Sequence, residues 1–170
     1  VPALKSGMIP GSKQWRYIPS LTPGQNPLKH LASALATSYE QSSDWVLQTV
    51  EQMQADPGHL AKLVESFGSD PAVVVIDQFE EVFTLCNDDA ARDAFVANLL
   101  SLTSSEIQHE VIVTLRTDYE SYLAYNAALM SSFEEGQVRV MPLSAAELRS
   151  AIEEPAKRVD LRFEEGDVDG

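Results

Sequence analysis

The spacing of apolar residues predicts several helices in the first part of the chain. Proline and glycine punctuate residues 1–27 and leave only residues 15–20 as a candidate for a short strand. Asn26-Pro27 is typical of a helix start, and apolar residues then recur at positions i, i+3, i+4 and i+7. The same spacing predicts two further helices, at about residues 44–55 and 60–67.

The middle and last parts of the chain carry short apolar runs that predict buried strands. Residues 72–76 and 111–115 are apolar at nearly every position, which is typical of parallel strands covered on both faces. Residues 138–141 predict a last strand, and helices are expected at about residues 79–85 and 88–102. Strands that alternate with helices predict an α/β fold with a doubly wound, mostly parallel sheet.

Two further helix starts follow from residue spacing. Thr117 with Glu120, and Ser144 with Glu147, have the spacing of a capping box, in which a hydroxyl and a carboxylate satisfy the first free N–H groups of a helix. A helix is therefore expected directly after each pair. We expect the second helix to end at Pro155, because proline lacks the N–H that the helix interior needs.

Composition narrows the class of protein. The 170 residues include 12 Lys and Arg against 26 Asp and Glu, so the net charge is −14, and such a surface repels phosphate backbones and anionic lipids. We therefore expect neither a nucleic-acid nor a membrane partner. The longest aliphatic run has about five residues, too short for a transmembrane helix or a signal peptide. A single cysteine, Cys86, fits a reducing, cytoplasmic location.

The strongest candidate for chemistry is Asp77, because function in such sheets lies at the carboxyl ends of the strands. Asp77 directly follows the run 72–76 and is followed by Glu80 and Glu81. A carboxylate there can hold a hydrated Mg²⁺, and a second carboxylate one turn later can orient an attacking water. The alternative is a capping box, in which Asp77 caps the next helix and Glu80 reaches back. The two roles are compatible.

Basic residues supply two weaker candidates. Arg116 follows the run 111–115 and would face the same crevice as Asp77, where a guanidinium can sense or neutralise a phosphate. Its alternative is a surface ion pair with Asp118 or Glu120. Arg149 and Lys157-Arg158 could reach an anion from a lid, and their alternative is an ordinary solvated helix face.

Several other kinds of site are not supported by the sequence. His30, His59 and His109 have no cysteine or carboxylate at metal-ligand spacing, and Cys86 has no basic neighbour to activate it. The chain contains neither a Gly-x-Ser-x-Gly motif nor a Gly-x-x-x-x-Gly-Lys-Ser/Thr phosphate loop.

The sequence also resembles a known family. Residues 73–85, VVVIDQFEEVFTL, resemble the Walker B segment of the STAND-class signalling ATPases, most closely the bacterial novel STAND group. The likeness covers nearly the whole chain. Residues 1–7 are similar to the end of the helix after the Walker A loop, and residues 15–28 to the second strand and next helix start. Residues 113–119 are similar to the fourth strand, and residues 134–156 to the fifth strand and its helix.

The resemblance implies a P-loop NTPase fold of the ASCE type, related to the AAA proteins, and an ATP-binding switch function. It implies that Asp77 holds the Mg²⁺ of Mg-ATP and that Glu80 or Glu81 positions the hydrolytic water. It places Arg116 at a sensor position. Members of this class are signalling proteins that change between a closed monomer and a self-associated form. They are typically fused to effector domains and to sensor repeats, often of the WD type.

The resemblance also sets expectations about domain boundaries. Residues 1–155 would form the NTPase core after the Walker A helix, and residues 156–170 would begin a lid, a helical region or an acidic linker. The first strand and the Walker A loop are expected immediately before Val1. The 170-residue piece alone is therefore expected to bind ATP weakly or not at all and to leave a gap in its sheet. The alternative function is a non-catalytic protein-interaction or scaffold module with a degenerate or truncated NTPase fold.

Overall fold

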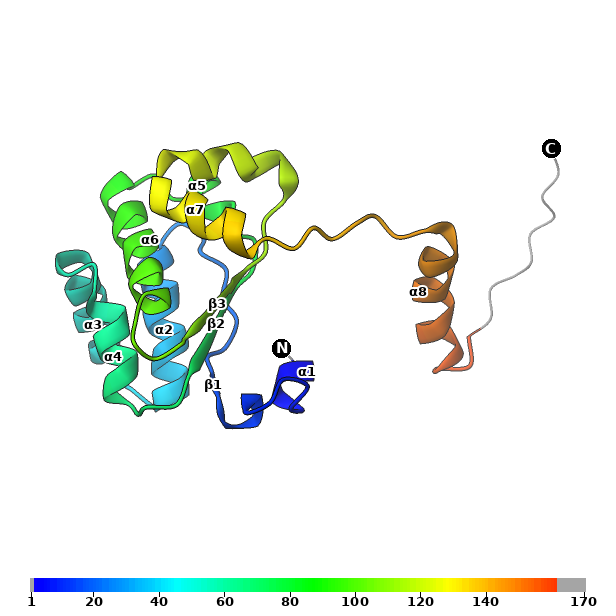
Figure 1. The fold of residues 1–170 in the computed structure, drawn as a ribbon, viewed down its shortest axis with the longest axis horizontal. Helices are drawn as coiled ribbons and strands as arrows, with labels where there is room; N and C mark the ends of the chain where they lie inside the picture. The colour runs from blue at the N-terminus through cyan, green and yellow to red at the C-terminus, as the bar shows by residue number, and fades with distance from the viewer. Residues whose placement is uncertain (1, 162–170) are drawn as a thin grey trace. The chain divides into compact units, whose positions relative to one another are not determined.

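The computed structural model describes residues 2–161, drawn in colour in Figure 1. The chain divides into two compact units, Val1–Glu135 and Gly136–Gly170, and each unit is described by itself. The first unit holds the sheet and most of the helices. In the part of the chain that the structure describes, no helix is long and apolar enough to cross a membrane.

Three parallel strands form the sheet of the first unit. The strands are β1 (Arg16–Tyr17), β2 (Ala72–Ile76) and β3 (Glu110–Val113), in the order β1-β2-β3. Both pairings are parallel, with Tyr17 opposite Val73 and Ile76 opposite Val113. The parallel α/β architecture predicted from the sequence is confirmed, and β2 spans the predicted residues.

Four helices pack against one another and against the sheet. They are α2 (Pro27–Tyr39), α3 (Ser43–Ala55), α4 (His59–Ser66) and α6 (Asp89–Thr103), all close to the predicted bounds. Figure 1 shows them together on one side of the strands. Their buried apolar residues form one core cluster with alternate residues of β2, namely Ala72, Val74 and Ile76. The alternation follows from the strand period of two, which turns Val73 and Val75 to the other face.

The remaining helices are short or exposed. α1 (Pro2–Lys5) and α5 (Glu81–Thr84) have four residues each, and η1 (Ser12–Gln14) is a single 3₁₀ turn. η2 (Thr117–Tyr125) is a 3₁₀ helix, so a helix begins where the first capping box predicts one, but the Thr117 side chain does not cap it. The last two helices are α7 (Ala127–Gly136) and α8 (Ala145–Lys157).

Helix α8 confirms one prediction and corrects another. Ser144 and Glu147 form the complete capping box at its start. Pro155, however, lies inside the helix, which continues to Lys157. Proline removes one N–H donor, but its fixed φ is close to the helical value, so a last turn that is exposed to water tolerates it.

The strand predicted at residues 138–141 is wrong. This segment has no regular structure, and the side chains of Val138 and Val140 are 87% and 93% exposed. Alternating β-branched residues favour an extended backbone, but a strand also needs a neighbour to accept and donate its hydrogen bonds. Within the described residues no strand pairs with this segment, and the sheet accordingly has three strands instead of four.

A buried histidine makes the stability of the sheet depend on pH. His109 Nδ1 accepts a hydrogen bond of 3.0 Å from the N–H of Ala72, the first residue of β2, so the ring must be neutral at that nitrogen. Burial, aided by the positive charge of Arg16, lowers the pKa of His109 below its ordinary value of 6.5. Because the pKa of His109 is higher in the unfolded chain, acid protonates the unfolded chain first. The stability that the neutral ring contributes is therefore complete above pH 6.5 and is lost as the pH falls toward the lowered pKa.

We expect His109→Asn to weaken this dependence, because an amide oxygen can accept the same hydrogen bond without titrating. Urea unfolding at about pH 7.5 and pH 5.5 measures the effect as the difference in unfolding free energy between the two conditions. His59, whose pKa burial also lowers, leaves a residual slope in the variant. The exposed His30 provides the control substitution. A slope unchanged by His109→Asn would contradict the prediction.

Candidate functional site

The candidate site lies where β2 and β3 end side by side. Asp77 follows β2 and Thr114 follows β3, and several backbone hydrogen bonds fix this edge. The Asp77 N–H donates to the Leu21 carbonyl at 2.8 Å, and the Thr114 N–H donates to the Ile76 carbonyl at 2.9 Å. The Phe79 N–H donates back to the Thr114 carbonyl at 2.9 Å. The backbone that carries Asp77 is thus held by both neighbouring segments.

The carboxylate of Asp77 has one engaged oxygen and one free oxygen. Its Oδ1 accepts hydrogen bonds from the Thr114 hydroxyl and from the Gln78 N–H, the latter at 3.1 Å. Its Oδ2 has no hydrogen-bond partner among residues 2–161, and the residue is exposed. A fixed carboxylate that offers one oxygen to solvent is a suitable ligand for a hydrated cation.

The capping-box alternative for Asp77 is wrong. Helix α5 begins at Glu81 and has no side-chain cap at its N-terminus. The Asp77 N–H, which a capping box would pair with Glu80, donates to Leu21 instead. The cause is Gln78, whose φ of 54° is left-handed and turns the chain before the helix begins. Such a conformation costs a non-glycine residue about 1–2 kcal/mol, and strain of this kind often accompanies function.

The two glutamates after Asp77 have different surroundings. Glu81 Oε2 accepts a hydrogen bond of 2.9 Å from the Gly24 N–H, so this side chain holds the loop that follows β1. Glu80 Oε2 is buried and has no hydrogen-bond partner in the described structure. Glu80 also lines an open hollow together with Asp77, Thr114 and Arg116. The structure therefore distinguishes two residues that the motif could not: Glu81 is held at the β1–α2 loop, and Glu80 lies at the site.

Arg116 lines the same hollow, but its charge is already paired. Its guanidinium donates two hydrogen bonds to the Asp118 carboxylate, at 2.8 and 3.2 Å, and lies 5.7 Å from the ring centre of Tyr119. The hydrogen bond with Asp118 raises the pKa of Arg116 above its ordinary value. Both partners are exposed, so the pair contributes little stability and exchanges readily. Because Nη1 donates to neither Asp118 oxygen, Arg116 can contact a phosphate through Nη1 while the pair stays closed.

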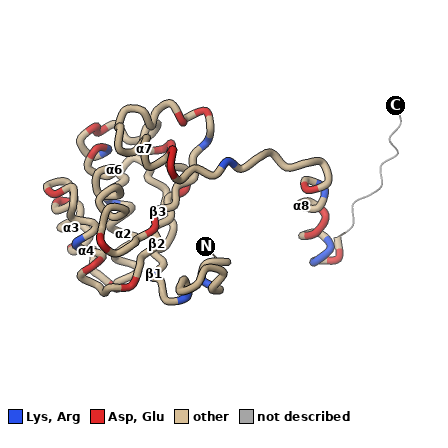
Figure 2. The backbone as a smooth tube through the Cα atoms, viewed as in Figure 1, with Lys and Arg blue, Asp and Glu red and all other residues tan. Residues whose placement is uncertain are grey.

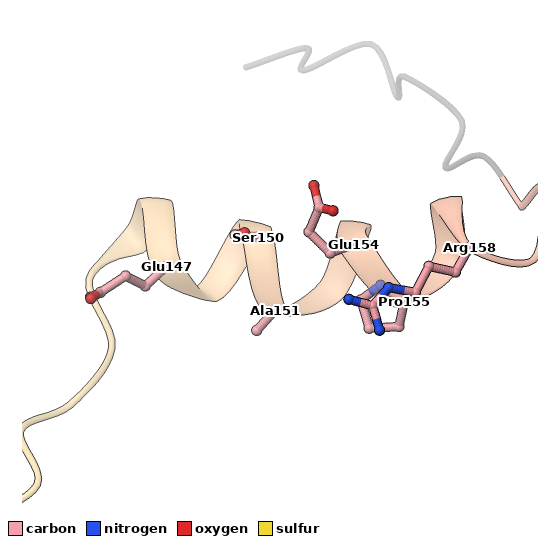
Figure 3. Close-up of a pocket in the computed structure, with 6 residues that line it drawn as sticks. All are labelled: Glu147, Ser150, Ala151, Glu154, Pro155 and Arg158. Atoms are coloured by element: carbon pink, nitrogen blue, oxygen red, sulfur yellow. The ribbon is translucent and has the colours of Figure 1, made fainter. Parts of the chain in front are cut away.

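The basic residues of α8 lie on a solvated helix face, as the alternative to an anion-binding lid predicts. Arg149 pairs with Glu153 at 3.7 Å, and Lys157 pairs with Glu153 and Glu154 at 3.4 and 3.2 Å. Figure 3 shows a shallow hollow beside Arg158 that is lined by residues of α8 and its C-terminal turn. Because one helix and its C-terminal turn supply the wall, this hollow has few groups that can enclose a ligand.

Acidic and basic residues are interspersed over the molecule. Figure 2 shows Asp and Glu along most elements, with the fewer Lys and Arg distributed among them. The formal net charge of −14 is therefore not offset by a basic stripe along one described element. Binding of an anionic ligand at Asp77 would need a compensating cation.

The side chains at the Asp77 edge fit a magnesium ion that is shared with a ligand. Among the described residues no group of three or more His, Cys, Asp or Glu side chains is placed to hold a metal alone. Mg²⁺ usually takes one or two protein carboxylates and fills its other positions with water and phosphate oxygens. The free oxygen of Asp77, a residue that lines the hollow, matches this smaller demand.

Thr114 is a site residue that the sequence analysis did not identify. The apolar run 111–115 predicts Thr114 as the fourth residue of a strand, whereas β3 ends at Val113 and Thr114 directly follows it. The available signal was a hydroxyl residue near the end of an apolar run that Arg116 follows. No local signal indicated that this hydroxyl contacts Asp77, because the two residues are 37 positions apart.

The comparisons with known proteins identify the family. The family model described as Novel STAND NTPase 1 matches residues 1–170. Neither the curated proteins nor the solved structures gave a significant match. The parallel α/β sheet is consistent with part of a P-loop NTPase fold, and an NTPase family implies a nucleotide as ligand. Because the match covers the whole chain, this protein belongs to the Novel STAND NTPase 1 family.

Proposed function

We propose that the edge at the ends of β2 and β3 is the Mg-ATP site of a signalling switch that hydrolyses ATP. The observation that carries the proposal is that Asp77 and Glu80 line one hollow and that each has a carboxylate oxygen with no hydrogen-bond partner in the described structure. Asp77 Oδ2 is unpartnered at the surface, and Glu80 Oε2 is unpartnered and buried. Buried polar atoms are rarely left without a partner, so the unpartnered Glu80 oxygen beside Asp77 supports a site that a ligand or water completes.

In this proposal Asp77 supplies the protein ligand to magnesium. The bound ion would neutralise phosphate charge and leave its other positions to phosphate oxygens and water. The role of the chain is to keep the carboxylate at a fixed place and orientation. The hydrogen bond that the Asp77 N–H donates to the Leu21 carbonyl fixes the backbone, and those that Oδ1 accepts from the Gln78 N–H and the Thr114 hydroxyl fix the carboxylate.

Glu80 is the residue that would accept a proton or hydrogen bond from the attacking water. Its Oε2 has no competing donor within the described residues, whereas Glu81 already accepts the Gly24 N–H. A positioned carboxylate in this role typically contributes a rate factor of about 10²–10⁴. Arg116 would contact the phosphates through Nη1, which its pair with Asp118 does not use.

The cradle for the triphosphate is proposed to come from a segment that precedes these 170 residues in the parent protein. The eight glycines of the chain do not form a phosphate loop. Backbone N–H groups of such a loop, together with its lysine, provide most of the grip on the phosphates. We also propose that the parent protein self-associates in its active state and is fused to sensor repeats or effector domains.

The test is Asp77→Ala in the full-length protein, followed by ATP turnover as a function of Mg²⁺ concentration. We expect the half-saturating Mg²⁺ concentration to rise at least about tenfold, equivalent to about 1.4 kcal/mol of lost metal binding. Asp88→Ala is the matched control, because the Asp88 side chain caps α6 through the Ala91 N–H. That variant should lose about 1 kcal/mol of stability and keep its Mg²⁺ dependence.

The result distinguishes a magnesium-binding role of Asp77 from a purely structural role. If Asp77→Ala lowers stability as Asp88→Ala does and leaves the Mg²⁺ dependence of turnover unchanged, the magnesium role is excluded. Absence of any ATP turnover or binding in the full-length wild-type protein would favour the non-catalytic interaction module instead.

A further inference from the structure

Thr114 contacts the whole turn that carries the proposed magnesium ligand. Its hydroxyl donates to Asp77 Oδ1 and accepts from the Gln78 N–H at 3.0 Å. Its backbone N–H and carbonyl bind Ile76 and Phe79, both at 2.9 Å. The residue that follows β3 thus contacts four consecutive residues, and three of them lie beyond the end of β2.

The hydrogen bonds of the Thr114 hydroxyl determine what it can do. A hydroxyl has one proton, and here that proton is given to Asp77. The oxygen meanwhile accepts the Gln78 N–H, so the group has no proton left to donate to a phosphate. Through these hydrogen bonds Thr114 acts on a bound nucleotide by way of Asp77 and the turn.

The same hydrogen bonds decide which oxygen of Asp77 is free. Gln78 is held in its left-handed conformation while its N–H is shared between Asp77 Oδ1 and the Thr114 hydroxyl. Rotation of the Asp77 carboxylate would break both bonds to Oδ1. The arrangement therefore keeps Oδ1 engaged and leaves Oδ2 as the free oxygen of a residue that lines the hollow together with Glu80 and Arg116.

We propose that Thr114 is a positioning residue that orients the Asp77 carboxylate for Mg²⁺, an inference that rests on the proposed function of this edge. Partners that hydrogen-bond to a metal ligand fix its orientation and are commonly worth about 10- to 100-fold in metal affinity or activity. Thr114 acts on the metal through Asp77 and does not contact the metal or the nucleotide.

The experiment uses the full-length protein, a fluorescent ATP analogue and a Mg²⁺ titration. Thr114→Val removes the hydroxyl at constant shape and is expected to raise the half-saturating Mg²⁺ concentration about tenfold. Thr114→Ser keeps the hydroxyl and is expected to retain the wild-type value. Nucleotide affinity measured in EDTA should be the same in all three proteins. Thr103→Val is the matched control, because Thr103 is exposed in the last turn of α6 and does not line the hollow at Asp77.

A double-mutant cycle tests whether Thr114 acts through Asp77. In the Asp77→Ala background, Thr114→Val is expected to have no further effect on the Mg²⁺ dependence. An additional tenfold effect in that background would overturn the inference, as would a wild-type Mg²⁺ dependence in Thr114→Val. If Thr114→Val unfolds, Thr114→Ala is measured in its place with the same expectation.

The two proposals fail in different ways. If Asp77→Ala leaves the Mg²⁺ dependence unchanged, the magnesium site itself is wrong. If Asp77→Ala shifts it and neither Thr114→Val nor Thr114→Ala does, the site stands and the positioning role of Thr114 is wrong.

Discussion

Glu80→Gln is expected to lower the kcat of ATP hydrolysis in the full-length protein by about 10²–10⁴-fold, while nucleotide binding is retained. The amide is nearly the same size as the carboxylate but cannot accept a proton from water. Because the Glu80 oxygen is buried at the site and unpartnered, the change removes a chemical capacity and breaks no protein hydrogen bond present in the described structure. Single-turnover hydrolysis, with nucleotide binding measured separately, checks this result.

Glu81→Gln is the matched variant one position later. Its amide oxygen can still accept the hydrogen bond from the Gly24 N–H, so the loop after β1 should stay in place and kcat should remain close to that of the wild type. The reverse result, a large loss for Glu81→Gln and none for Glu80→Gln, would show that the assignment of the two glutamates is wrong. Equal losses in both variants would contradict the division of roles that we propose for Glu80 and Glu81.

Asn98→Leu is expected to destabilise the domain by about 3 kcal/mol or more, because it leaves several buried backbone groups without partners. Asn98 on α6 is fully buried. Its Oδ1 accepts the Leu60 N–H at 3.0 Å, and its Nδ2 donates to the carbonyls of Met53 and Ala94, both at 2.8 Å. Helix α4, whose N-cap is Gly58, has no local side-chain cap, so Asn98 serves as its cap from another helix.

Chemical denaturation compares Asn98→Leu with Asn87→Leu, in which an exposed asparagine before α6 is replaced. The control should change the unfolding free energy by no more than about 0.5 kcal/mol. A cost for Asn98→Leu similar to that of the control would mean that α3, α4 and α6 do not depend on this residue. Neither change should alter the Mg²⁺ dependence of turnover, because Asn98 does not line the hollow at Asp77.

The site was only partly predictable from the sequence. Asp77 and Arg116 could be placed at one edge from the order of the strands, because parallel strands end together. In the structure both residues line one hollow. The choice between Glu80 and Glu81 was not accessible, because it depends on a hydrogen bond to Gly24, 57 positions away. The pair between Arg116 and Asp118 was named as an alternative, because residues so close in sequence can meet without tertiary structure.

The sequence by itself determined the elements whose cause is local. Apolar spacing specified α2, α3, α4, α6 and the buried strand β2, and the spacing of Ser144 and Glu147 specified the cap of α8. The helices and the cap depend on side chains within one or two turns of each other. The burial of β2 is visible in the sequence as a run of apolar residues.

Only the tertiary structure decided how distant residues share hydrogen bonds. It set Thr114 against Asp77 and Asn98 against Leu60, pairs separated by 37 and 38 positions. It also left residues 138–141 without a strand partner in the described structure, although their pattern is that of a strand. The physical reason is the same in each case: a hydrogen bond needs a partner at a defined distance and direction, and packing of the whole domain alone brings such partners together.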